Sequence, residues 1–81
     1  MLQPKIKKVV PLKDYKLLLS YETGENKVFA VKPYIAGNWY GELRDISYFK
    51  TVHLIPDGTG IAWTNGQDIA PHELYEQSSP L

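Results

Sequence analysis

The chain has 81 residues, no cysteine and a formal net charge of zero at pH 7. This length fits one small domain, residues 1–81, and the lack of cysteine excludes disulfides and cysteine-ligated zinc sites. The two histidines, His53 and His72, leave only a histidine–carboxylate metal site, for which the sequence has no ligand spacing. A domain of this size buries only roughly 60% of its unfolded surface, so oligomerisation is an available source of further stability.

Charge is balanced overall but not along the chain. Residues 1–32 carry seven lysines against three acidic residues, a net +4, whereas residues 33–81 carry a net −4. The simplest interpretation is that the two halves pack as complementary surfaces, within one subunit or between two. The alternative is weak nucleic-acid binding through an N-terminal lysine edge at Lys5, Lys7 and Lys8. That edge is poor in phosphate-binding groups, because Arg44 is the single arginine of the sequence.

The first half of the chain predicts three strands. Residues 6–11 form a lysine-rich strand that Pro11 places at a sheet edge, because proline cannot donate to a ladder. Residues 15–21 and 26–31 are rich in apolar and aromatic residues, and the glycine in the loop at 22–25 supplies the positive φ of a tight turn. These two segments therefore predict a hairpin, which Pro33 ends.

The second half predicts short helical turns, another hairpin and a helix. Two turns lie between residues 33 and 50, the second capped by Asp45. Residues 51–55 and 61–64 form the second hairpin around a Pro-Asp-Gly turn at 56–60. Asn65-Gly66 then turns the chain, and Pro71 opens the last helix, with the cap at Asp68 or at Ala70. The polar tail at 77–81 is expected to be frayed.

These elements predict one α+β domain: a small antiparallel sheet of two hairpins joined by short helical turns, with a C-terminal helix packed on the sheet. The ordered core spans about residues 6–76. We expect Trp39, Leu43, Ile46 and Phe49 of the helical turns to pack onto the sheet. The predicted core residues are apolar and come from every element: Val9, Leu17, Leu19, Val28, Leu43, Phe49, Leu54, Ile61, Trp63 and Leu74.

Enzymatic chemistry has no support in the residues. The sequence contains no nucleophile–base–acid set, no glycine-rich phosphate loop and no metal cluster, so we expect neither catalysis nor a cofactor. His53 lies in a predicted strand and is expected to be half-buried or paired across it. His72 and Glu73 are adjacent in the last helix and therefore do not face each other. A small-molecule-binding or enzymatic domain is the alternative function.

A protein-binding surface has more support in the sequence than enzymatic chemistry does, although the same residues can also be explained by structural roles alone. Asn65-Gly66 makes a turn, Asp68 can bond local backbone amides, and Trp63 can lie in the core. The aromatic residues between 34 and 49 can likewise cap one face of the sheet. The functional alternative is a protein-binding surface, where Trp and Tyr are enriched. Its candidate residues are Trp39, Tyr40, Trp63, Asn65, Asp68 and Tyr75.

The segment 61–75, IAWTNGQDIAPHELY, carries a family pattern, and the hairpin YKLLLSYETGE…FAV and the centre LRDISYFKTV precede it in the family's order. From about residue 6 to residue 75 the chain resembles the bacterial family called domain of unknown function 2442. It departs at Ala30, where members often carry an acidic residue.

The resemblance implies a compact α+β unit with no assigned enzymatic activity. Some members look like partners of small neighbouring proteins, in arrangements similar to toxin–antitoxin pairs. We therefore expect a non-catalytic protein–protein interaction module, antitoxin-like, whose partner is another protein or a second copy, with a homo-oligomer slightly favoured. No signal peptide and no membrane-spanning run is visible in the sequence, so the expected location is cytoplasmic.

Overall fold

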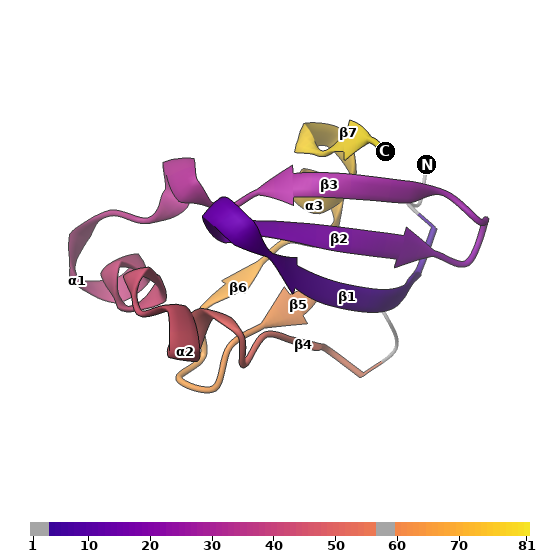
Figure 1. The fold of residues 1–81 in the computed structure, drawn as a ribbon. Helices are drawn as coiled ribbons and strands as arrows, with labels where there is room; N and C mark the ends of the chain where they lie inside the picture. The colour runs from indigo at the N-terminus through magenta and orange to yellow at the C-terminus, as the bar shows by residue number, and fades with distance from the viewer. Residues whose placement is uncertain (1–3, 57–59) are drawn as a thin grey trace.

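The computed structural model describes residues 4–56 and 60–81, which form two antiparallel sheets with short helices (Figure 1). The first sheet has the order β1-β2-β3-β7, with β1 at Ile6–Leu12, β2 at Lys16–Tyr21, β3 at Asn26–Ala30 and β7 at Ser79–Pro80. The second has the order β4-β5-β6, with β4 at His53–Leu54, β5 at Ile61–Ala62 and β6 at Asp68–Ile69. The predicted α+β class is confirmed, and its two hairpins lie in separate sheets.

The first hairpin forms as predicted. The amide of Tyr21 donates to the carbonyl of Glu25 at 2.9 Å, and Gly24 has φ +92°. Along β2, Leu17, Leu19 and Tyr21 are buried, so they share the core face. Among the described strands, β1 pairs with β2 only, so it forms an edge of this sheet, as Pro11 predicted.

The segment between the sheets contains four short helical turns rather than the two predicted. They are η2 (Lys32–Tyr34), α1 (Gly37–Tyr40), η3 (Gly41–Arg44) and α2 (Ile46–Phe49). The cap at Asp45 is confirmed, because its carboxylate accepts from the amides of Ser47 at 2.9 Å and Tyr48 at 3.4 Å. Turns this short bury one side only, so Leu43 and Phe49 are buried while Trp39 and Ile46 are 52% and 49% exposed. The prediction that these last two pack onto the sheet is wrong.

The second hairpin also forms, with Leu54 opposite Ile61, but each strand is only two residues long. The tip of its predicted turn, residues 57–59, lies outside the described residues. Strand β6 was not predicted. It forms because the turn after Trp63 folds the chain back, so that Ile69 pairs with Ile61.

The C-terminal helix α3 spans Pro71–Gln77, with Ala70 as its N-cap and Pro71 at its start, and it buries Leu74. The tail that follows is not frayed as predicted. Ser79 lies opposite Val28 in β7, and the amide of Leu81 donates to the carbonyl of Asn26 at 3.0 Å. Backbone pairing with β3 orders this polar tail without any apolar burial.

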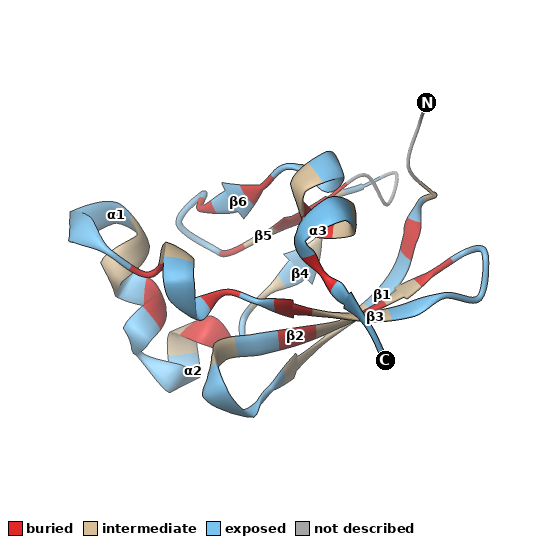
Figure 2. Ribbon diagram, turned by 90° about the horizontal axis from the view of Figure 1, so that it is seen from above, coloured by how far each residue is buried: buried red, intermediate tan, exposed pale blue. Residues whose placement is uncertain are grey.

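The core lies between the two sheets, as the buried positions in Figure 2 show. Seven of the ten predicted core residues are buried: Leu17, Leu19, Leu43, Phe49, Ile61, Trp63 and Leu74. The other three, Val9, Val28 and Leu54, are half-buried. Buried apolar residues that the prediction omitted are Ile6, Tyr21, Phe29, Val31, Ile35 and Ile69. Among the described residues, no helix is both long enough and apolar enough to cross a membrane.

Candidate functional site

Trp39 forms the centre of the most distinctive surface of the molecule. It sits on α1, is 52% exposed, and lies against the turn between β5 and β6. Its Cη2 and Cζ2 atoms are 3.8 Å from the position that a Cβ would occupy on Gly66, whose φ is +104°. The positive φ favours glycine at position 66, and the indole of Trp39 lies over this residue at ordinary contact distance.

Gln67 holds this surface in place from below. It is fully buried, and its Nε2 donates to Glu42 Oε1 at 2.6 Å and to the carbonyl of Trp39 at 2.9 Å. Its Oε1 accepts from the hydroxyl of Tyr48 at 2.6 Å. That hydroxyl in turn accepts from the amide of Asn65 at 2.8 Å, and Asn65 Nδ2 donates to Glu42 Oε2 at 3.0 Å. A satisfied network of this kind fixes α1, η3, α2 and the turn relative to one another.

Two further candidates belong to the same end of the molecule. Asp68 is exposed, and its carbonyl accepts from the hydroxyl of Tyr40 at 3.1 Å. We define the Trp39 surface as Trp39, Tyr40, Glu42, Asn65 and Asp68. Glu42 and Asp68 are the acidic residues of this surface and both are exposed, so the surface carries a negative formal charge.

Trp63 does not belong to this surface. Its side chain is 1% exposed, packs against Phe49 with ring centroids 5.9 Å apart, and donates from Nε1 to the carbonyl of Phe49 at 2.8 Å. Trp63 is therefore a core residue, and the prediction that it belongs to a binding surface is wrong. A fully packed indole with a satisfied N–H is typical of a core.

Tyr75 also lies away from the Trp39 surface, on α3. Its hydroxyl donates to the carboxylate of Glu25 at 2.9 and 3.0 Å, and the ammonium of Lys27 lies 3.9 Å from its ring centroid. The hydrogen bond to Glu25 raises the pKa of Tyr75 above its usual value. These contacts fasten α3 to the first hairpin, which explains Tyr75 structurally.

Both histidines are exposed. His53 is exposed and lies opposite Ala62 across the β4–β5 ladder, the second of its two predicted placements, and its Nδ1 lies 3.4 Å from the carbonyl of Thr51. His72 is exposed, while the neighbouring Glu73 carboxylate accepts from the hydroxyl of Tyr34 at 2.5 Å. In the part of the chain that the structure describes, no group of three His, Asp or Glu residues could hold a metal ion.

The Tyr34–Glu73 bond predicts an alkaline titration. This bond raises the pKa of Tyr34 to about 12, because the hydroxyl donates to the Glu73 carboxylate and the phenolate formed on ionisation would be repelled by that carboxylate. Since the folded pKa exceeds the unfolded value of about 10, the associated stability is present below pH 10 and is lost as the pH rises towards 12. Glu73→Gln should return the pKa of Tyr34 towards 10, measured as phenolate absorbance. Burial raises the pKa of Tyr21 to about 12 as well, and that value should not move; an unchanged titration in Glu73→Gln would contradict the bond.

Sequence reasoning missed Gln67 and Glu42, which organise the Trp39 surface. Glutamine is seldom fully buried, so its residue type gave no reason to expect a structural role. The only signal was the position of Gln67 between Gly66 and Asp68 in the family pattern. Glu42 lies 25 residues away along the chain from Gln67, so no local pattern connects the two.

A comparison with protein families matches residues 6–80 to the family described as "Protein of unknown function (DUF2442)". The chain belongs to this family. The match spans both sheets and all the helices of the DUF2442 chain, and it includes the Trp39 surface. No curated protein and no solved structure matches the chain.

Proposed function

We propose that this DUF2442 chain is a non-catalytic protein–protein interaction module of the cytoplasm that binds its partner through the Trp39 surface. The observation that carries the proposal is the placement of Trp39. An indole that is 52% exposed is held on a rigid hydrogen-bonded base, so little conformational entropy is lost when a partner covers it. Exposed tryptophans on ordered backbone are common binding hot spots.

The charge around Trp39 indicates the chemistry of the partner. The face of an indole attracts cations, and the Trp39 surface also includes the carboxylates of Glu42 and Asp68. Both carboxylates are exposed residues, and Glu42 is oriented by Gln67 and Asn65. The surface therefore suits a partner that presents lysine or arginine next to an apolar group.

An antitoxin-like role is the finer form of this proposal. An acidic and aromatic surface is suited to covering a small basic protein, and the family resemblance points to partners encoded by neighbouring genes. In this form, the protein of the neighbouring gene would bind at Trp39 and would compete there with any other partner.

Trp39→Ala tests the proposed function. We expect it to abolish or strongly weaken the complex, because removal of a hot-spot side chain typically costs about 2 kcal/mol or more of binding free energy. The measurement is light scattering of the purified chain, alone and co-expressed with the protein of its neighbouring gene. Leu81→Ala is the matched control, since Leu81 is a large apolar residue that is 81% exposed and sits beside β3.

Two results would count against the proposal. One is a chain that stays monomeric and recovers no stoichiometric partner under either condition. The other is a complex that Trp39→Ala and Leu81→Ala weaken equally, because binding would then not be centred on the Trp39 surface.

A further inference from the structure

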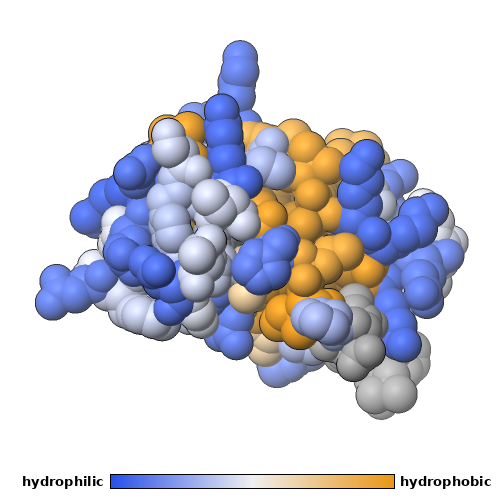
Figure 3. All heavy atoms as spheres, turned by 90° about the horizontal axis from the view of Figure 1, so that it is seen from below, coloured by the Kyte–Doolittle hydropathy of each residue, from blue (hydrophilic) through white to orange (hydrophobic). Residues whose placement is uncertain are grey.

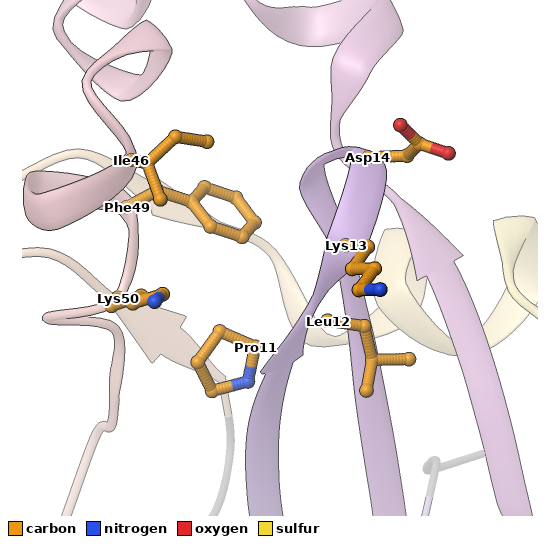
Figure 4. Close-up of a pocket in the computed structure, with 7 residues that line it drawn as sticks. All are labelled: Pro11, Leu12, Lys13, Asp14, Ile46, Phe49 and Lys50. Carbon is orange, nitrogen blue, oxygen red and sulfur yellow. The ribbon is translucent and has the colours of Figure 1, made fainter.

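A groove opens on the other side of α2 from the Trp39 surface. It has a volume of about 500 Å3 and lies between α2 and the turn that follows β1, which includes η1 (Lys13–Tyr15) (Figure 4). Its lining residues are Pro11, Leu12, Lys13, Asp14, Ile46, Phe49 and Lys50. We call it the η1–α2 groove.

The rims of this groove are apolar and unusually exposed. Leu12 is 39% exposed on one side and Ile46 is 49% exposed on the other. They are two of the four large apolar residues that are exposed in the described part of the chain, and Trp39 is a third. Apolar residues that gather around a hollow in this way mark a binding surface more often than scattered ones do.

The groove carries positive charge on both walls. Lys13 stands on the η1 side and Lys50 on the α2 side, and Figure 4 shows the Asp14 carboxylate directed away from the space between them. The η1 wall is also strained: Asp14 and Tyr15 both have positive φ, +61° and +57°. Non-glycine residues in the left-handed region are strained, and such strain clusters at functional sites.

Helix α2 separates the groove from the Trp39 surface and contributes to both. Tyr48 points to the turn and accepts from the amide of Asn65 at 2.8 Å, whereas Ile46, Phe49 and Lys50 line the groove. Figures 1 and 2 show α1 and α2 at the same end of the molecule. An acidic indole surface and a lysine-flanked apolar groove therefore lie next to each other, on either side of one helical turn.

We infer that the occupant of the η1–α2 groove is the Trp39 surface of a second copy of this chain. A two-fold axis close to α2 places each surface over its complement in the partner, so one contact is made twice, as in isologous dimers. The indole packs between Leu12 and Ile46, and Lys13 and Lys50 face the carboxylates of Glu42 and Asp68. This inference rests on the proposed function and names the partner of the same surface.

The charged residues at this end of the molecule support this arrangement. Lys13 and Lys50 line the groove, whereas Glu42 and Asp68 belong to the Trp39 surface, so contact between two grooves or between two Trp39 surfaces would be repulsive. The proposed dimer instead brings a surface of each sign together. It also adds apolar burial to a domain whose own core is small.

A charge reversal tests the inference. The double variant Lys13→Glu/Lys50→Glu should raise the dimer dissociation constant about tenfold or more, because it places like charges opposite each other. Adding Asp68→Lys to it should recover part of the affinity. The measurement is light scattering across a dilution series, with circular dichroism to verify that each variant is folded.

A matched control distinguishes this face from another one. Figure 3 shows an apolar area on the lower face of the molecule, over β1 and β4, bordered by hydrophilic side chains. Lys5→Glu/Lys8→Glu makes the same charge change on exposed positions at the other end of β1. A dimer weakened by this pair, and not by Lys13→Glu/Lys50→Glu, overturns the inference.

A chain that stays monomeric throughout the dilution series also overturns it. In that case, a neighbouring-gene protein that binds the monomer through Trp39 would leave the proposed function standing. If dimerisation follows the predicted charge pattern, Trp39→Ala should dissociate the dimer as well, and both proposals are then supported.

Discussion

Trp63→Ala should lower the free energy of unfolding by roughly 3–5 kcal/mol, the usual range for truncating a buried tryptophan. The side chain is 1% exposed and lies against Phe49, so alanine would leave a cavity between the sheets. It would also leave the carbonyl of Phe49 without the 2.8 Å hydrogen bond from the indole. The measurement is equilibrium unfolding in urea, followed by circular dichroism.

Trp39→Ala is the control, because it removes the same atoms from an indole that is 52% exposed. Its effect on unfolding should be a small fraction of that of Trp63→Ala. Trp63→Phe should fall between the two, since it keeps a ring in the core and loses the N–H donor. An unchanged melting temperature in Trp63→Ala would place the residue on the surface and contradict the core described above.

Gln67→Leu should lower the free energy of unfolding by roughly 1–3 kcal/mol, although it replaces a polar side chain in the core with an apolar one of similar size. The cost arises because its partners lose their hydrogen bonds. The hydroxyl of Tyr48 loses an acceptor, and Glu42 and the carbonyl of Trp39 lose a donor. Asn65→Ala is the control, since Asn65 is exposed and its side chain makes one bond to Glu42.

Gln67→Glu makes the same site sensitive to pH. A buried carboxyl next to Glu42 should have a folded pKa above the unfolded value of about 4.3. The variant is therefore closest to the wild type below that pH, and it loses stability relative to the wild type as the pH rises through the folded pKa. A stability difference that stays constant between pH 4 and pH 8 would contradict the buried contact with Glu42.

The local elements follow from short stretches of sequence. Gly24 sets the first hairpin, Asp45 caps α2, and Pro71 starts α3, and in each case a few neighbouring residues decide the outcome. These predictions hold because backbone sterics and local hydrogen bonds act within a few residues.

The errors share a different cause. Ser79–Pro80 is polar, but it gains order from the backbone of β3, a partner some 50 residues earlier that tail composition does not reveal. Trp39 and Ile46 are apolar, yet their turns are too short to bury both sides, and Leu43 and Phe49 occupy the core positions. Which apolar residue of a short turn becomes buried depends on the orientation of the whole turn against the sheets.

The candidate site shows the same division. The sequence by itself determined that Trp63, Asn65, Gly66 and Asp68 form a turn-centred unit at the end of a strand. Only the tertiary structure decided that Trp63 belongs to the core, that Trp39 covers Gly66, and that Gln67 and Glu42 connect the two segments. Turn chemistry is local and can be read from adjacent residues, whereas exposure and long-range hydrogen bonds exist only once distant segments have packed together.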